Sequence, residues 1–289
     1  MNLPLKLSEI KPYKEKAGWK ALLQLCFEQK KTANSTQTVL GQTRHYGPLR
    51  VQRAFYPEND LAHIYILHPP GGVVGGDILH IEFTLQKNTQ VLATTPGSGK
   101  FYLSAGSWAQ LQQRLKIKPG ASLEWLPQEN ILFSGARLQA RTRIECQGDG
   151  TFIGWDISCL GRPTSNETFT QGAFDSRLEF YHNDTLLFIE NQRVFNEQSL
   201  HAVAGLRGHA LQASLLAFPC NRNQLETVRK QIETFSSELI SATLIDGLLV
   251  IRVLGDNSEL IKKQLIKIWQ VLRPVMLKRF AVLPRIWAT

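Results

Sequence analysis

The sequence predicts a mainly β fold in which stacked antiparallel or mixed sheets form a sandwich-like or β-helix-like body, followed by two α-helices in the C-terminal third. Many short segments alternate apolar and polar residues with a period of two. Gly, Pro and Asn separate these segments at short intervals, and helical spacing begins only beyond residue 220. This order favours a sandwich, a barrel or a stacked-sheet solenoid over a parallel α/β sheet.

The clearest strand covers residues 111–118, where Leu111, Leu115 and Ile117 share one face and mostly charged residues share the other. Such alternation is typical of a strand with one buried face. Residues 79–85 and 138–146 alternate in the same way. Further strands are predicted at residues 20–28, 62–67, 89–95, 121–126, 174–181, 185–190 and 209–218.

The C-terminal third begins with an amphipathic helix behind Asn223, with Glu226 placed for a capping box. Its apolar stripe is Leu225, Val228, Ile232, Phe235 and Leu239. Residues 242–245 and 248–254 flank Asp246-Gly247, a pair that favours a two-residue hairpin turn because both positions need positive φ.

A second helix is predicted to start near Asp256 or Ser258 and to stop close to Pro274, because proline cannot continue a helical hydrogen-bond ladder. Its stripe is Ile261, Leu265, Ile268, Trp269 and Leu272. The sequence contains no internal repeat or long linker, so we expect one domain over residues 1–289.

The composition is that of a globular protein, with 43% hydrophobic and 20% charged residues. The first residues include several lysines and form no apolar signal segment, and four scattered cysteines suggest no disulfide framework. We therefore expect a soluble, cytoplasmic protein. A formal charge of +9 favours an acidic partner, but no nucleic-acid-binding signature accompanies it.

Motifs for common catalytic sites are missing. The segment 97–100 ends in Gly-Lys, but a phosphate-binding loop would need glycine where Thr94 stands and Ser or Thr where Phe101 stands. The sequence also contains no zinc-protease helix motif and no nucleophile elbow.

A glycine-rich segment, residues 68–77, reads His-Pro-Pro-Gly-Gly-Val-Val-Gly-Gly-Asp. Its four glycines allow close backbone packing ahead of a strand. A tight loop between strands explains the segment structurally. The functional interpretation is that this loop holds Asp77 in a fixed position, facing a partner or a polar passage.

This segment resembles the glycine-rich signature of the UreD (UreH) family of urease accessory proteins, and five others resemble it in the same order. They are residues 47–58 (GPLRVQRAFYPE), 94–97 with 100–102 (TTPG and KFY), 123–129 (LEWLPQE), 159–163 (CLGRP) and 284–289 (PRIWAT). Their shared order extends the resemblance over nearly the whole chain.

The resemblance implies a non-catalytic maturation factor, or chaperone, that helps to insert nickel into urease. It implies a complex with UreF and the GTPase UreG on the urease apoprotein, and UreE as a possible nickel donor. GTP would be bound by UreG, so this chain needs no cofactor of its own, and neither nucleic acid nor membrane is an expected partner.

Transit of Ni²⁺ requires ligands that release the ion, and sparse carboxylates meet this need better than converging histidines or thiolates. We expect Asp77, Glu129 and Asp156 to line a transient nickel passage, with Thr94 and Thr95 adding hydroxyl oxygens. Alternatively, these carboxylates bind loop amides or pair with nearby arginines. An all-β hydrolase or lyase that uses two of them as acid and base is the other function considered.

Overall fold

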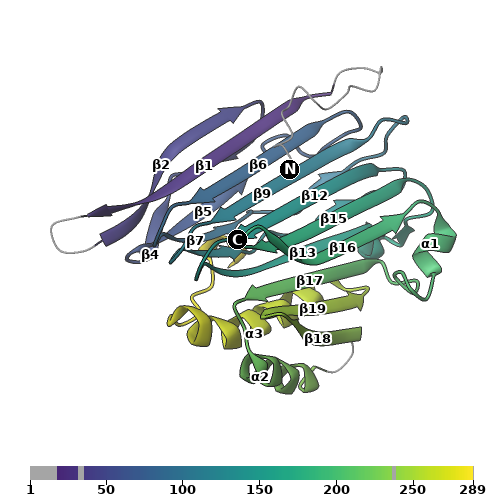
Figure 1. Cartoon of the computed structure of the whole chain (residues 1–289). Helices are drawn as coiled ribbons and strands as arrows, with labels where there is room; N and C mark the ends of the chain where they lie inside the picture. Colours follow the sequence, from purple (N-terminus) through teal and green to yellow (C-terminus); the bar gives the residue numbers. More distant parts are fainter. Residues whose placement is uncertain (1–17, 32–35, 236–238, 289) are drawn as a thin grey trace.

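The computed structural model describes residues 18–31, 36–235 and 239–288. Residues 1–17, which bear on the expected absence of a signal segment, and Thr289, which ends the last motif, lie outside this range. The described residues form two stacked β-sheets, with the helices α2 and α3 on the outer side of one of them (Figure 1).

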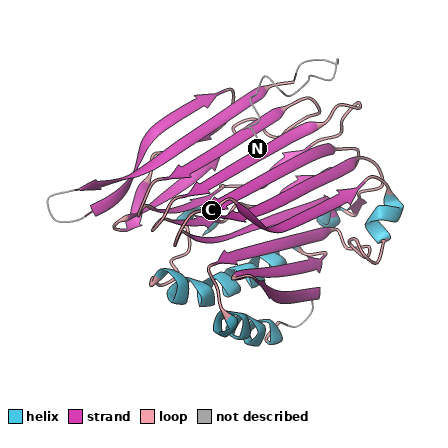
Figure 2. Cartoon of the chain, in the orientation of Figure 1, coloured by secondary structure: helices cyan, strands magenta, loops and turns pink. Residues whose placement is uncertain are grey.

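The first sheet has seven strands among the described residues and no helix across its outer face (Figure 2). In spatial order these are β16 (Thr185–Val194), β15 (Ala173–His182), β12 (Arg137–Cys146), β9 (Ala109–Ile117), β6 (Ile78–Leu85), β1 (Lys20–Lys31) and β2 (Thr36–Tyr46). The five strands from β15 to β1 are parallel, and antiparallel strands close both ends.

The second sheet has twelve strands in the described part of the chain. Its main path is β18 (Leu239–Ile245), β19 (Leu248–Gly255), β17 (Leu211–Phe218), β13 (Thr151–Arg162), β10 (Ser122–Trp125), β7 (Gln90–Thr94), β5 (Leu61–Leu67) and β3 (Arg50–Val51). The short strands β4 (Phe55–Glu58), β8 (Gly99–Phe101), β11 (Asn130–Leu132) and β14 (Glu167–Thr168) pair beside this path.

The chain winds between the two sheets in successive coils. It passes from β6 to β7, from β9 to β10 and from β12 to β13, and each coil adds one parallel strand to each sheet. Register keeps like side chains in line, so that Leu79, Leu111 and Ala140 stack across three neighbouring strands. The predicted mainly β fold is confirmed, and the winding is the solenoid-like form of it.

Two apolar clusters stabilise this arrangement. One fills the space between the sheets, and Phe27, Phe83 and Leu115 at its centre are 0% exposed. The other lies between the twelve-stranded sheet and the helices, where Leu265 and Trp269 are also fully buried. Since β13 contributes to both clusters, alternate residues of this strand face the two different cores.

The helix α3 (Ser258–Leu277) is also tied to the sheet by buried charges. The guanidinium of Arg273, fully buried, lies 2.8 Å from carboxylate oxygens of both Glu58 and Glu124. Trp269 Nε1 donates a hydrogen bond of 2.6 Å to Glu124, and His63 bonds Glu58 at 2.9 Å. These contacts link α3 to the sheet through Glu58 and Glu124.

The C-terminal predictions were correct in type but wrong in several boundaries. The helix α2 (Arg222–Glu233) is capped by Asn221 with Gln224, so the cap predicted at Asn223 with Glu226 was two residues late. This helix ends at Glu233, and Leu239 belongs to strand β18 rather than to the helical stripe.

The helix α3 continues three residues beyond Pro274, whose ring lies within the last turn. The hairpin at Asp246-Gly247 is confirmed, with φ of 46° and 82°. A short helix that was not predicted, α1 (Glu197–His201), follows β16. No helix in the described part of the chain combines the length and the apolar character needed to cross a membrane.

Candidate functional site

A layer of polar side chains interrupts the apolar space between the two sheets. Gln113, for example, takes an inward position between Leu111 and Leu115 on β9, where the alternation calls for an apolar residue. The layer consists of Gln113, Thr142, Asp156, Ser176, Glu190, Gln192, Gln212 and Ser214. Because six different strands contribute, the layer crosses the core from sheet to sheet.

Asp156 lies at the centre of this layer on β13. Its inward direction follows from the register, since Phe152 and Leu160 on the same strand belong to the core between the sheets. Among the described residues it accepts a single long hydrogen bond, 3.4 Å from the Ser158 hydroxyl. Burial and the nearby carboxylate of Glu190 raise the pKa of Asp156 to about 6.

Glu190 comes from the edge strand β16 and is the second carboxylate of the layer. One of its oxygens accepts a hydrogen bond of 2.6 Å from the Ser214 hydroxyl, and the other pairs with Arg252. Arg252 is 55% exposed, so it holds Glu190 from the solvent side. The two carboxylates therefore differ, because Glu190 is paired and Asp156 has no cationic partner among the described residues.

Cavities follow the polar layer through the protein. A large cavity of about 280 Å³ reaches Asp156 from one side, and two small ones of about 10 Å³ each continue past it toward Ser214 and Glu190. A groove of about 640 Å³ then opens at Glu190. Asp156 lines the large cavity and both small ones. Glu190 lines one of the small cavities and the groove, so consecutive spaces share a lining residue.

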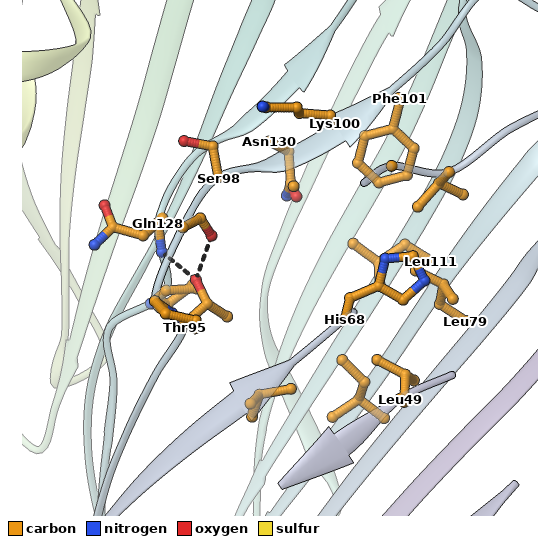
Figure 3. Close-up of a pocket in the computed structure, with 18 of the residues that line it drawn as sticks. Leu49, His68, Leu79, Thr95, Ser98, Lys100, Phe101, Leu111, Gln128 and Asn130 are labelled. Carbon is orange, nitrogen blue, oxygen red and sulfur yellow. Dashed lines mark hydrogen bonds between the residues drawn. The ribbon is translucent and has the colours of Figure 1, made fainter. Parts of the chain in front are cut away.

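The large cavity is lined by the glycine-rich loop, the loop 95–100 and apolar residues of the core (Figure 3). Figure 3 shows His68 beside Leu49, Leu79 and Leu111, while Gln128 and Ser98 lie on the opposite side. Burial lowers the pKa of His68 although Asp77 counteracts this effect.

Asp77 is placed differently from what a passage requires. Its two carboxylate oxygens accept hydrogen bonds from the backbone N–H groups of Trp19, at 2.8 Å, and Val74, at 3.0 Å. It is 8% exposed and lines none of the four spaces. This geometry matches the alternative of a carboxylate that binds loop amides. Through Val74, Asp77 holds the backbone of the glycine-rich loop in place.

Glu129 lies apart from Asp156, in another cavity of about 240 Å³ that it shares with Lys100, Arg162 and Asp256. It accepts a hydrogen bond of 2.8 Å from the Ser98 hydroxyl. The three predicted carboxylates are therefore not brought together.

The two threonines have mainly structural contacts. Thr94 is 1% exposed; its hydroxyl donates to the Leu126 carbonyl at 2.6 Å and accepts from Trp287 Nε1 at 3.0 Å. The Thr95 hydroxyl donates to the Gly97 carbonyl and accepts from the backbone N–H of Gln128, as the dashed lines in Figure 3 show. Thr95 lines the large cavity.

The residues that the sequence analysis missed are Glu190 and the uncharged members of the layer. A signal for them exists, because Gln113, Thr142 and Glu190 stand at inward positions of segments whose other inward residues are mostly apolar. Thr142 donates a hydrogen bond of 2.9 Å to Gln113, which shows that the polar positions of neighbouring strands meet. A single polar residue at an inward position of an alternating strand therefore indicates a polar site within the core.

Comparison with known proteins finds one family that is similar to this chain over nearly its whole length. The family model for the UreD urease accessory protein matches residues 20–288. A urease accessory protein UreD from Alcanivorax borkumensis is 48% identical over 273 residues, 94% of this chain and 93% of the relative. Those from Citrobacter koseri and Pseudomonas putida are 45% and 42% identical, each over 94% of this chain and over 92% and 95% of the relative. The chain belongs to the UreD family of urease accessory proteins.

Proposed function

We propose that this chain assists the maturation of urease as a non-catalytic scaffold, and that Ni²⁺ passes through it between the two sheets. In this proposal the chain docks with UreF and the GTPase UreG on the urease apoprotein in the cytoplasm. UreE supplies nickel, and GTP hydrolysis by UreG provides the free energy. Membership of the UreD family supports the general role in urease maturation. The polar layer between the sheets supports the nickel passage.

The observation that carries the passage is the series of four spaces joined by Asp156 and Glu190. A continuous line of polar groups in an otherwise apolar core lowers the cost of moving a cation through it. The two middle cavities have the size of a single water molecule. An ion in them exchanges most of its hydration shell for protein oxygens.

The ligands of the layer favour transit over storage. They are carboxylate, amide and hydroxyl oxygens, whereas tight nickel sites use imidazole or thiolate. Within the described residues, no three His, Cys, Asp or Glu side chains are placed to hold one metal ion together. Ni²⁺ therefore meets one or two carboxylates at a time and can move on.

The raised pKa of Asp156 marks a carboxylate that burial and the nearby Glu190 destabilise. With a pKa of about 6, this group is mostly ionised at neutral pH and can receive a passing cation. A cation between Asp156 and Glu190 reduces the repulsion between the two carboxylates.

The alternative of a hydrolase or lyase finds less support. Such an enzyme needs a second carboxylate facing the same substrate. Asp156 is the sole Asp or Glu among the described residues that line the large cavity, and Asp77 and Glu129 lie elsewhere. The space between Asp156 and Glu190 holds no more than a water molecule.

The proposed function is tested by expressing urease with its other accessory proteins, with and without this chain. We expect purified urease to contain little nickel without the chain and to regain it when the chain is supplied from a plasmid. Elemental analysis of the purified enzyme gives the result. Fully metallated, active urease from cells without this chain would contradict the proposal.

A further inference from the structure

The two sheets differ in extent at the end where β16 lies. The seven-stranded sheet stops at β16, whereas the opposite sheet continues through β17 and β19 to β18. The inner faces of β17 and β19 pack in the core between the sheets at Leu216, Leu248 and Val250, whereas the row at Arg252 and the inner face of β18 extend past β16 in the described part of the chain. The groove of about 640 Å³ lies at this place, bounded by β16 and residues 203–207.

The floor of the groove is ordered by register. Ser214, Arg252 and Ser241 lie side by side across β17, β19 and β18. The next row has Gln212, Leu254 and Leu239. Exposed apolar side chains border this floor, because Ile189 is 39% and Val203 79% exposed, and Leu239 in the second row is 47% exposed. A polar row and an apolar row thus run next to each other in an open groove.

Both strands that border the groove are edge strands. β16 pairs only with β15 and β18 only with β19 among the described residues, and the free edge of β16 offers unpaired backbone N–H and C=O groups beside the groove. An unpaired edge of ten residues, as in β16, is a template for an added strand. A strand added beside β16 would extend the short sheet over the uncovered floor.

We propose that this groove binds an extended segment of a partner protein, which adds to β16 as a further strand and places a carboxylate against Arg252 and Arg207. Main-chain bonds to an edge and side chains in alternate pockets are a general mode of peptide recognition. Arg207 is exposed and donates to the Val203 carbonyl, and Arg252 is 55% exposed. Both guanidiniums can bind a carboxylate.

The lining favours polypeptide over nucleic acid. No aromatic side chain is present among its described residues to stack on a base. An extended segment with apolar residues and one acidic residue satisfies both rows of the floor.

The position of the groove connects docking to transit, and this part of the inference rests on the proposed function. Glu190 lines both the groove and the small cavity next to Asp156. A partner carboxylate that binds Arg252 shares that guanidinium with Glu190 and weakens the pairing of Arg252 with Glu190. Docking then makes Glu190 more available to the cation, which favours transit toward a bound partner.

Filling the groove tests the inference. Ser241→Trp places a bulky uncharged side chain on the exposed floor, and Val275→Trp is the matched control at a 46% exposed site on α3. We expect Ser241→Trp to weaken co-purification with urease and the other accessory proteins at least tenfold, and Val275→Trp to leave it unchanged. Circular dichroism verifies that both variants fold. Equal co-purification of both variants would overturn the inference.

Hydrogen exchange and cross-linking locate the contact in the unmodified complex. We expect slower amide exchange in β16 and β18 on assembly, while the edge strand β2 keeps its rate. A photo-cross-linker at Ser241 should join to urease or an accessory protein. Cross-links within the chain or to a second copy, or unchanged exchange in β16, would overturn the inference. Docking is read by association alone, so urease that acquires nickel without this chain would refute the proposed function separately.

Discussion

Two buried carboxylate pairs in this protein have opposite surroundings. Under α3, Glu58 and Glu124 share the guanidinium of Arg273 and accept further bonds from His63 and Trp269. Between the sheets, Asp156 faces Glu190 with a single long hydrogen bond from Ser158. The first cluster satisfies its charges internally, which suits a structural role. The second leaves capacity for a cation, which suits transit.

The pKa values follow the same division. Burial opposes ionisation of Glu58, but the hydrogen bonds from His63 and Arg273 lower its pKa to about 2. Burial and a like charge raise that of Asp156 to about 6. The pKa values of Glu58 and Asp156 thus shift in opposite directions, because only Glu58 has a cationic partner among the described residues.

The largest effect should come from breaking the satisfied cluster. Arg273→Met leaves two carboxylates unpaired under α3 and should lower the free energy of unfolding by about 3–5 kcal/mol. Urea unfolding followed by circular dichroism measures this change. A loss below about 1 kcal/mol would show that the cluster contributes little to stability.

Neutralising Asp156 should raise the free energy of unfolding, whereas Arg273→Met lowers it. The pKa of Asp156 is about 6 in the folded protein against 3.8 normally, so the folded state binds more protons and stability falls as pH rises from about 4 to 6. Asp156→Asn removes this penalty and should stabilise the protein by about 3 kcal/mol at pH 8. Below about pH 3.8 the two proteins should be equally stable, and unfolding curves across this range test the sign.

Asp77→Asn should have a smaller effect, because an amide oxygen can still accept one of the two loop hydrogen bonds. We expect a loss of about 1 kcal/mol, with nickel transfer unchanged while the chain stays folded. Thermal unfolding and the nickel content of urease measure the two parts. If the variant had normal stability but lost nickel transfer, Asp77 would be part of the nickel passage.

Glu129→Gln should have the smallest effect. The carboxylate accepts one hydrogen bond from Ser98, which the amide oxygen can replace, and it lies away from Asp156. We expect a change within about 0.5 kcal/mol and full nickel transfer. A clear loss of urease nickel with this variant would indicate a second route through the cavity that holds Glu129.

The sequence predicted the fold wherever one face of a strand is buried and the other is not, as in β9 and β12. Two long strands escaped prediction. Most residues of β13 are buried because both faces contact a core, whereas the second half of β2 is exposed throughout, and neither pattern has a period of two. The carboxylates could be proposed from motifs, but their grouping depends on the pairing of distant strands.

The partner of each carboxylate is equally invisible in one sequence. Glu124 and Arg273 are 149 residues apart and meet only because α3 folds back across β10. Glu190 and Asp156 become neighbours because β16 closes the sheet opposite β13 and β17. The sequence does show that polar residues such as Gln113 and Glu190 stand at inward positions of alternating strands.

The passage itself is tested most directly by the nickel content of urease matured with the Asp156→Asn protein. Co-purification must first show that the variant still assembles with urease, and Glu129→Gln is the control. We predict an intact complex and a several-fold loss of urease nickel for Asp156→Asn, with normal nickel for the control. Normal nickel with Asp156→Asn would show that the ion does not depend on this carboxylate and would contradict the account.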